Sequence, residues 1–186
     1  VAWEKVIMFH LDEYIGLPQT HPASFRKYLH ERFTDLVPVT AYFVNTEGDL
    51  ERNLQELTRS LRNEPIDIGV IGIGENGHIA FNDPPADFDT KEAYKVVNLD
   101  EKCRKQQVGE GWFESVEETP GQAVSMTPYQ IMQCKSIISV VPDGRKAEAI
   151  KKTIDACQTT NLVPATLLKE HPDWHLYLDR DSASLL

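Results

Sequence analysis

Short apolar runs recur along the chain, each of a length typical of a β-strand. Three of them hold few polar residues, a pattern typical of strands buried on both faces of a parallel sheet. We therefore expect buried strands within residues 5–11, 66–74 and 136–141. Less apolar runs predict two further strands at residues 94–99 and 174–178.

The segments between these runs show the spacing of amphipathic helices. Residues 48–65 place four leucines on one helix face, with Asp49 as a cap and Pro65 after the end. Further helices are predicted after the N-cap Ser24 and after Thr127, and a last one within residues 142–157. The alternation of strands and helices predicts an α/β fold with a mostly parallel sheet, in which residues 12–18, DEYIGLP, form a polar loop.

Residues 69–85, GVIGIGENGHIAFNDPP, contain the spacing G-x-G-x-x-G of a dinucleotide site. Such a site needs a long helix that begins inside the motif, because the helix N-terminus holds the pyrophosphate. Pro84 and Pro85 leave room for at most one helical turn. No Lys-Ser or Lys-Thr pair follows the glycines, which excludes a P-loop. Two interpretations remain, namely a structural turn and a polar ligand-binding loop at a strand end.

The composition narrows the class of partner. The chain of 186 residues has 19 Lys and Arg against 29 Asp and Glu, a net charge of −10. This balance disfavours nucleic acid and an anionic membrane as partners. The three cysteines form no CxxC pair, so we expect neither a disulfide framework nor a zinc site. The length fits one domain, and without a signal peptide or a long apolar run we expect a soluble, cytoplasmic protein.

Loops that follow parallel strands gather at one edge of a sheet, and three such loops carry polar side chains here. They bring Asp12 and Glu13, then His78 and Asp83, and then Lys146. Carboxylates and an imidazole are the groups that general acid–base catalysis needs near neutral pH. A metal site at Asp12, His78 and Asp83 is an alternative, although the spacing matches no zinc or calcium pattern. In the plainest interpretation Asp12, Glu13 and Lys146 are ordinary solvated residues.

Two segments, LDEYIGLP and GIGENGHIAFNDP, resemble the signature loops of the glucosamine-6-phosphate deaminase/isomerase family. The family patterns are D-E-Y-x-G-L and G-x-[ND]-G-H-I-[AG]-F-N-E-P. The related 6-phosphogluconolactonases lack the IAFN continuation and fit less well. The resemblance implies a doubly wound α/β fold, a three-layer sandwich whose N-terminal part, with a Gly/Thr-rich phosphate loop, is absent from this chain. We expect the chain alone to be weakly active or inactive for that reason.

The resemblance also implies a reaction. The sugar ring of glucosamine 6-phosphate opens, a proton moves from C2 to C1, and ammonia and fructose 6-phosphate form, as part of amino-sugar catabolism. No cofactor and no metal are needed. Asp12 matches the proton-transfer base and His78 the ring-opening residue. Asn76 stands where members have Asn or Asp, and Asp83 stands where Glu is usual, so both are counted with the catalytic residues.

Substrate-binding candidates follow from the same resemblance. Lys146 matches a lysine that contacts the sugar phosphate, and Gly77 lies in the signature loop. The family has an arginine before an aromatic pair in its lid. Here residues 87–121 are the candidate lid, Gly111 precedes the pair, and Arg104 is the candidate substitute. The alternatives are a non-catalytic protein that binds sugar phosphates and a related isomerase or lactonase. A homo-oligomer is left open.

Overall fold

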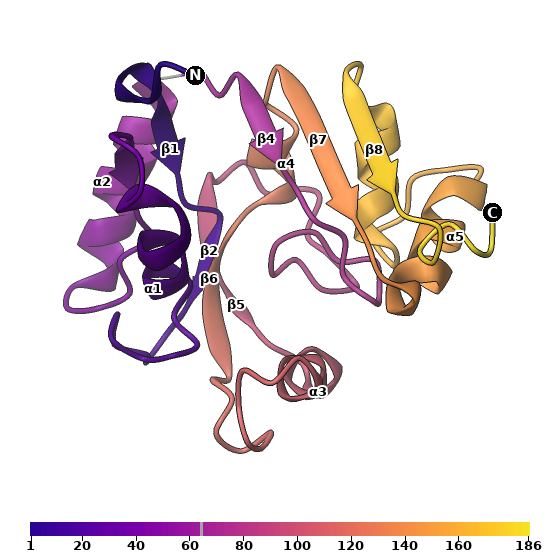
Figure 1. The fold of residues 1–186 in the computed structure, drawn as a ribbon, viewed down its shortest axis with the longest axis horizontal. Helices are drawn as coiled ribbons and strands as arrows, with labels where there is room; N and C mark the ends of the chain where they lie inside the picture. Colours follow the sequence, from indigo (N-terminus) through magenta and orange to yellow (C-terminus); the bar gives the residue numbers. More distant parts are fainter. Residues whose placement is uncertain (64) are drawn as a thin grey trace. The chain divides into compact units, whose positions relative to one another are not determined.

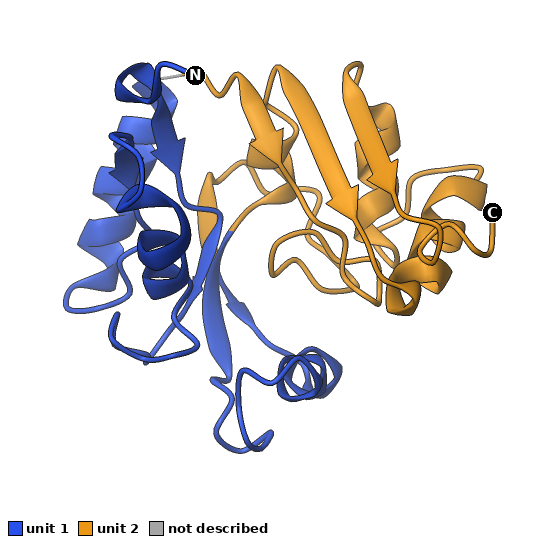
Figure 2. Cartoon of the chain, in the orientation of Figure 1, with its two compact units in different colours: residues 1–63, 96–125 blue, residues 64–95, 126–186 orange. Residues whose placement is uncertain are grey.

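The computed structural model describes residues 1–63 and 65–186, which form two compact units (Figures 1 and 2). Unit 1 contains residues 1–63 and 96–125, and unit 2 contains the described part of 64–95 together with 126–186. Each unit is therefore built from two separate stretches of chain. Within the described residues, the helices are all too short or too polar to cross a bilayer.

Unit 1 contains small sheets of short strands. β1 (Ile7–Phe9) and β3 (Thr40–Tyr42) pair in parallel. β2 (Asp12–Tyr14) pairs antiparallel with β6 (Gln122–Met126), and β6 also lies beside β5 (Tyr94–Asn98). The first two residues of β5 and the last residue of β6 are assigned to unit 2. The antiparallel pair is an exception to the mostly parallel strand pairing that the sequence predicts.

Two helices of unit 1, α1 and α2, begin at the predicted caps. The Ser24 hydroxyl accepts from the Lys27 amide at the start of α1 (Phe25–Leu29), which continues as a π-helical turn over His30–Thr34. The Asp49 carboxylate accepts from the Arg52 amide, 3.1 Å away, at the start of α2. The remaining elements of this unit are a 3₁₀ turn (Trp3–Lys5), α2 (Leu50–Asn63) and α3 (Glu101–Gly109).

Unit 2 is built on a sheet in the order β4, β7, β8, and its strands are parallel. The bounds are Ile68–Val70 for β4, Ser136–Val141 for β7 and Trp174–Leu178 for β8. Thr127 caps α4 (Pro128–Ile131) as the sequence predicts, with Pro128 in the first turn. A 3₁₀ turn (Gly144–Lys146), α5 (Ala147–Asp155) and a 3₁₀ segment (Pro164–Glu170) complete the unit. The α/β class and the mostly parallel pairing are confirmed.

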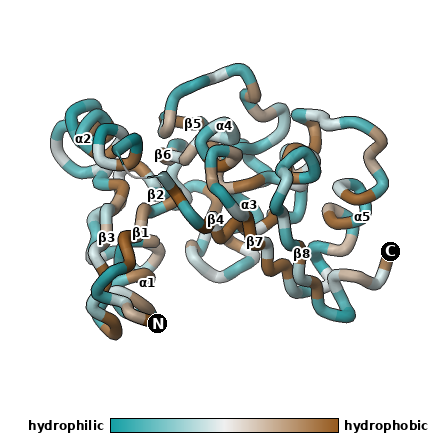
Figure 3. The backbone as a smooth tube through the Cα atoms, turned by 90° about the horizontal axis from the view of Figure 1, so that it is seen from above, coloured by the Kyte–Doolittle hydropathy of each residue, from teal (hydrophilic) through white to brown (hydrophobic). Residues whose placement is uncertain are grey.

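The expectation that these strands are buried on both faces is wrong. Alternate residues of a strand point to opposite faces of the sheet, and only one face is packed here. In β7, Ile137 and Val141 are buried, whereas Val140 is 57% exposed. Val70 of β4 is 71% exposed, and Ile7 of β1 is 45% exposed. Figure 3 shows how apolar β4 and β7 are despite this exposure.

The predicted polar loop at residues 12–18 is also corrected. Its first three residues form β2, and Glu13 and Tyr14 have no exposed surface. An acidic residue tolerates such burial only when its carboxylate is paired or hydrogen-bonded, and Glu13 meets that condition at the start of α1. The acidic pair Asp12-Glu13 thus opens a buried strand rather than a solvated loop.

Candidate active site

The glycine-rich loop leaves β4 and turns back on itself. The Gly74 amide donates to the carbonyl oxygen of His78 over 2.9 Å, and the Gly77 amide donates to that of Gly74 over 3.0 Å. Gly77 has a φ of +84°, a conformation that glycine adopts at little cost. No helix occurs between β4 and β5 in the described chain. The prediction that at most one helical turn fits in this loop is therefore confirmed for the described residues.

This turn packs the imidazole of His78 against Gly74. A Cβ added at Gly74 would lie 2.1 Å from ring atom Cε1, so only glycine leaves room for the ring. A Cβ added at Gly72, the first glycine of the motif, would have no other atom within 4 Å. The glycines of the motif thus differ in role, because Gly77 supplies the turn and Gly74 the space for the imidazole.

The side chains of Asn76, His78 and Asp83 meet on this loop. Nδ1 of His78 lies 2.7 Å from Oδ1 of Asn76 and 3.2 Å from Oδ1 of Asp83. The Asn76 amide group donates from Nδ2 to Asp83 Oδ1 over 3.0 Å. Because Oδ1 of Asn76 can only accept, Nδ1 of His78 carries the proton in the neutral ring, and Nε2 is the atom that can accept one. The side chains of His78 and Asp83 are only 13% and 10% exposed.

Further contacts hold the glycine-rich loop in place, and no sequence pattern predicts most of them. Nδ2 of the buried Asn82 donates to the carbonyl oxygens of Ile79 and Met126, over 2.9 and 2.8 Å. The Ala165 amide donates to the Gly77 carbonyl oxygen over 2.8 Å. Val163 contacts the same glycine, where an added Cβ would lie 2.8 Å from its Cγ1. Val163 and the first turn of the 3₁₀ segment Pro164–Glu170 therefore pack against the glycine-rich loop.

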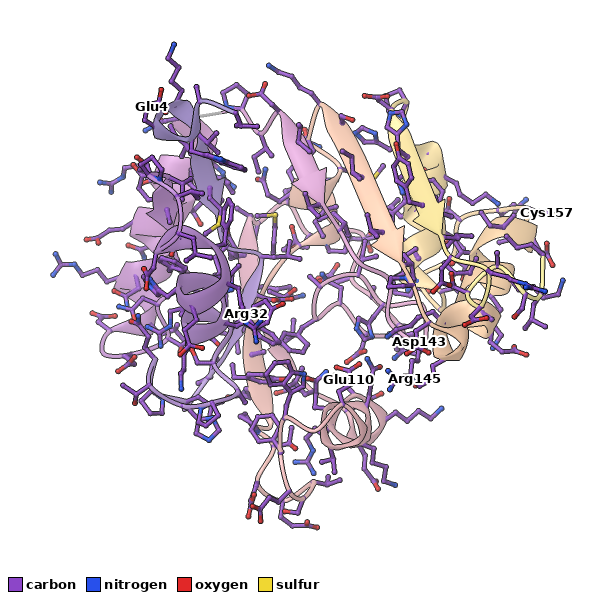
Figure 4. All side chains as sticks on the ribbon, viewed as in Figure 1. Glu4, Arg32, Glu110, Asp143, Arg145 and Cys157 are labelled. Atoms are coloured by element: carbon purple, nitrogen blue, oxygen red, sulfur yellow. The ribbon has the colours of Figure 1, made fainter. Side chains whose placement is uncertain are left out.

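The loop after β7 lies beside the glycine-rich loop, as the parallel pairing of β4 and β7 predicts. Nη1 of Arg145 lies 3.7 Å from Oε1 of Glu75. The same guanidinium donates to the Asp143 carboxylate over 2.8 and 3.1 Å, and it lowers the pKa of Asp143 to about 2 (Figure 4). Lys146 follows in the same turn and is half-buried. Cationic side chains thus accompany the imidazole in unit 2, and the phosphate contact of Lys146 stays a prediction.

Asp12 and Glu13 are consecutive carboxylic acids with opposite surroundings. Glu13 is fully buried, and its carboxylate accepts hydrogen bonds from the first residues of α1. The Asp12 carboxyl receives no hydrogen bond from residues 1–63 or 65–186. Burial, followed by the negative charge of Glu13, raises the pKa of Asp12 to about 7. A carboxyl with that pKa is poised to take up and return a proton near neutral pH.

The candidate lid contains ordered secondary structure that packs on β2. The Tyr14 hydroxyl donates to Oε1 of Gln107 on α3 over 2.6 Å, and the ring of Phe113 lies edge-on to Tyr14 at 5.5 Å. Arg104 lies on α3, half-buried, and its Nε makes no hydrogen bond to the described residues. Whether residues 87–121 form a lid, and whether Arg104 replaces the family's arginine, stay predictions.

The predicted site residues therefore fall into two groups. Asp12 and Arg104 belong to unit 1, and the other group, in unit 2, comprises Asn76, Gly77, His78, Asp83 and Lys146. Within unit 2, the contacts above join the glycine-rich loop to the loop after β7. The assembly of both groups around one substrate stays a prediction. Among the described residues, no three His, Cys, Asp or Glu side chains form a group that could hold a metal ion.

Comparisons with known proteins agree with the motifs. Residues 1–176 match the family described as glucosamine-6-phosphate isomerases/6-phosphogluconolactonase. Glucosamine-6-phosphate deaminases of Thermoanaerobacter pseudethanolicus and Exiguobacterium sibiricum are each 37% identical over 100% of this chain, which spans 74% and 73% of their lengths. A solved monomeric glucosamine-6-phosphate deaminase superposes with a TM-score of 0.91 at 30% identity, covering 100% of this chain and 77% of that one. The 6-phosphogluconolactonase of Trypanosoma brucei shares the fold. It superposes with a TM-score of 0.74 at 18% identity, covering 96% of this chain and 73% of that one.

Replacing Gly74 by alanine should displace the His78 imidazole, because the new Cβ would overlap the ring. We expect the hydrogen bond from Nδ1 to Asn76 to be lost. Imidazole ¹⁵N NMR would report this as loss of the protected Nδ1–H signal. Gly72→Ala is the matched control, since its added Cβ meets nothing within 4 Å. An unaltered imidazole signal in Gly74→Ala would contradict the described packing.

Proposed function

The chain belongs to the family of glucosamine-6-phosphate isomerases and 6-phosphogluconolactonases, and on that premise we propose that it converts glucosamine 6-phosphate and water to fructose 6-phosphate and ammonia. The observation that carries the proposal is that each unit supplies a proton-transfer group of a different kind. One is the carboxyl of Asp12, and the other is the oriented imidazole of His78. The reaction is an aldose–ketose isomerisation with hydrolytic deamination, and it belongs to the breakdown of amino sugars.

Asp12 is the proposed base of the isomerisation. Its carboxylate takes the proton from C2 of the open-chain sugar, and the resulting acid returns a proton at C1. A base with a pKa of about 7 can perform both transfers at neutral pH, because neither protonation state is strongly favoured. The lack of a hydrogen bond to this carboxyl from the described residues supports the role, since its oxygens are not engaged elsewhere.

His78 is the proposed ring-opening residue. Its Nδ1 is held by Asn76 and faces Asp83, so Nε2 is the atom that carries a proton between the anomeric hydroxyl and the ring oxygen. The close contact between the ring and Gly74 fixes its plane. Such orientation matters because proton transfer requires donor and acceptor within hydrogen-bond reach.

The phosphate of the substrate is the proposed partner of the cationic turn after β7. Lys146 follows Arg145 in that turn, and both lie in the unit that carries His78. A net charge of −10 makes local positive charge necessary for binding of an anionic sugar. Gly77 and Arg104 stay further candidates for substrate contact, although both backbone groups of Gly77 already bond within the fold.

A direct assay distinguishes the proposal from its alternatives. The purified full-length protein is incubated with glucosamine 6-phosphate, and ammonia and fructose 6-phosphate are each measured by a coupled enzyme. Equal amounts of both products support the proposal. Hydrolysis of 6-phosphogluconolactone without ammonia release would favour a lactonase, and binding of the amino sugar phosphate without any product would favour a non-catalytic protein.

Asp12→Asn should abolish turnover while substrate binding persists. The amide keeps the size of the side chain but cannot accept a proton, and loss of a general base costs about 10²–10⁴-fold in rate. In the parent protein, kcat/KM should fall as the pH is lowered through about 7, because Asp12 becomes protonated. A variant that keeps more than half of the parental rate would refute the assignment.

His78→Gln and Asp83→Asn should each slow the reaction of the closed ring form, and the double variant should lose little more. Residues that act as one unit give non-additive losses, and Nδ1 of His78 lies 3.2 Å from Asp83 Oδ1. The rates of the two single variants and the double variant form the test. If the losses multiply, and Asp83→Asn merely lowers the melting temperature, Asp83 has a structural role only.

A further inference from the structure

Both oxygens of the Glu13 carboxylate accept hydrogen bonds near the start of α1. Oε1 accepts from the amides of Tyr14 and Phe25 over 2.9 and 3.2 Å. Oε2 accepts from the Ser24 hydroxyl over 2.9 Å and from the Arg26 amide over 2.8 Å. The side chain has no exposed surface. Three of these hydrogen bonds join strand β2 to the cap and first turn of α1 through a single side chain, and the fourth lies within β2.

A buried cation accompanies this carboxylate. Nε of Arg26 lies 3.5 Å from Oε2 of Glu13, and the arginine side chain is 5% exposed. The guanidinium also donates to Glu47 over 2.7 Å and to Asn45 over 3.1 Å, which fixes its position. Donors and a cation at such distances favour the ionised form of a carboxyl and offset the cost of its burial. Glu13 therefore carries a fixed negative charge inside the protein.

We propose that Glu13 is a positioning residue for Asp12, which fixes β2 to α1 and places a negative charge on the residue next to the reacting one in the strand. The proposal rests on the proposed function only in that Asp12 is taken as the base. Its geometric basis is the adjacency of the two residues in a three-residue strand whose register with β6 is set, with Asp12 opposite Ser125 and Glu13 opposite Val124.

The charge of Glu13 has a defined effect on Asp12. A negative charge nearby disfavours ionisation of a second carboxyl and so raises its pKa. Burial is the larger cause of the raised pKa of Asp12, and Glu13 is the second. Without Glu13, Asp12 would be a weaker base, because its proton would be held less tightly. The two consecutive acids thus have separate tasks, one as a reacting group and one as its fixed neighbour.

Other ionisable groups around β2 do not replace this effect. Upstream of the strand, His10 is neutral, since burial, and then Arg26, lower its pKa to about 3. Burial raises the pKa of the Tyr14 phenol far above its usual value, so it stays neutral as well. In the region of α3, Cys103 and Glu110 add to this rise in the pKa of Tyr14. Opposite Asp12, β6 supplies only the uncharged Ser125.

The test is an NMR titration of the Asp12 carboxyl carbon, assigned by the loss of its signal in Asp12→Asn. In Glu13→Gln the midpoint of Asp12 should fall by about 0.5–1.5 pH units, the size expected on removal of a neighbouring like charge. Glu56→Gln removes the same charge from an exposed position on α2 and should leave the midpoint unchanged. An unchanged midpoint in folded Glu13→Gln would overturn the proposal.

Glu13→Gln removes one of the two carboxylates that face the buried guanidinium of Arg26 and could fail to fold. The pair Arg26→Met and Glu13→Gln/Arg26→Met avoids this, because the cation is absent from both. A lower Asp12 midpoint in the double variant than in Arg26→Met supports the proposal, and equal midpoints overturn it. The titration needs no turnover. A lowered midpoint therefore supports the coupling of Glu13 to Asp12 whatever the deaminase activity, which the assay of the full-length protein tests separately.

Discussion

The parallel pairing of β4 with β7 is the constraint on which the unit 2 part of the candidate site depends. The two strands run in the same direction side by side, so the loops that follow them emerge at the same edge of the sheet. One loop carries His78 with Asn76 and Asp83, and the other carries Arg145 and Lys146. The ion pair between Glu75 and Arg145 joins them directly. The loop that carries the imidazole and the loop that carries the cationic groups thus come together through strand pairing, although they lie far apart in the sequence.

The carboxyl groups of the candidate site show how one functional group acquires different tasks. Glu13 is surrounded by donors and faces Arg26, which keeps it charged. Asp12, its neighbour, lacks such donors among the described residues and has a pKa near 7. Asp83 accepts from Asn76 and faces an imidazole. Acids in contrasting surroundings are typical of acid–base catalysis, and here the local donors of strand, helix and loop give each carboxyl group its own surroundings.

Much of this arrangement could be predicted from local patterns. The caps Ser24, Asp49 and Thr127 act within a few residues of their own position, so the sequence alone indicates them. The short glycine-rich loop likewise follows from Pro84 and Pro85. Burial of β4 and β7 could not be predicted, because apolar character does not tell which face finds a packing partner. The strand character of Asp12–Tyr14 was missed for a related reason, since three of the four donors that permit burial of Glu13 come from residues 24–26, outside the motif.

The glycine-rich loop accommodates the shorter acid Asp83 through the side chain of Asn76. Where the family pattern has Glu, this chain has Asp83, whose carboxylate reaches one methylene less far. Asn76 lies between it and the imidazole, donating to Asp83 from Nδ2 and accepting from His78 at Oδ1. The amide therefore fixes the tautomer of the ring, and the carboxylate orients the amide while remaining 3.2 Å from Nδ1. In the ring opening proposed for His78, the ring carries a second proton, and the Asp83 carboxylate faces it directly. Orientation and charge stabilisation, which one longer acid could supply together, are thus divided between Asn76 and Asp83.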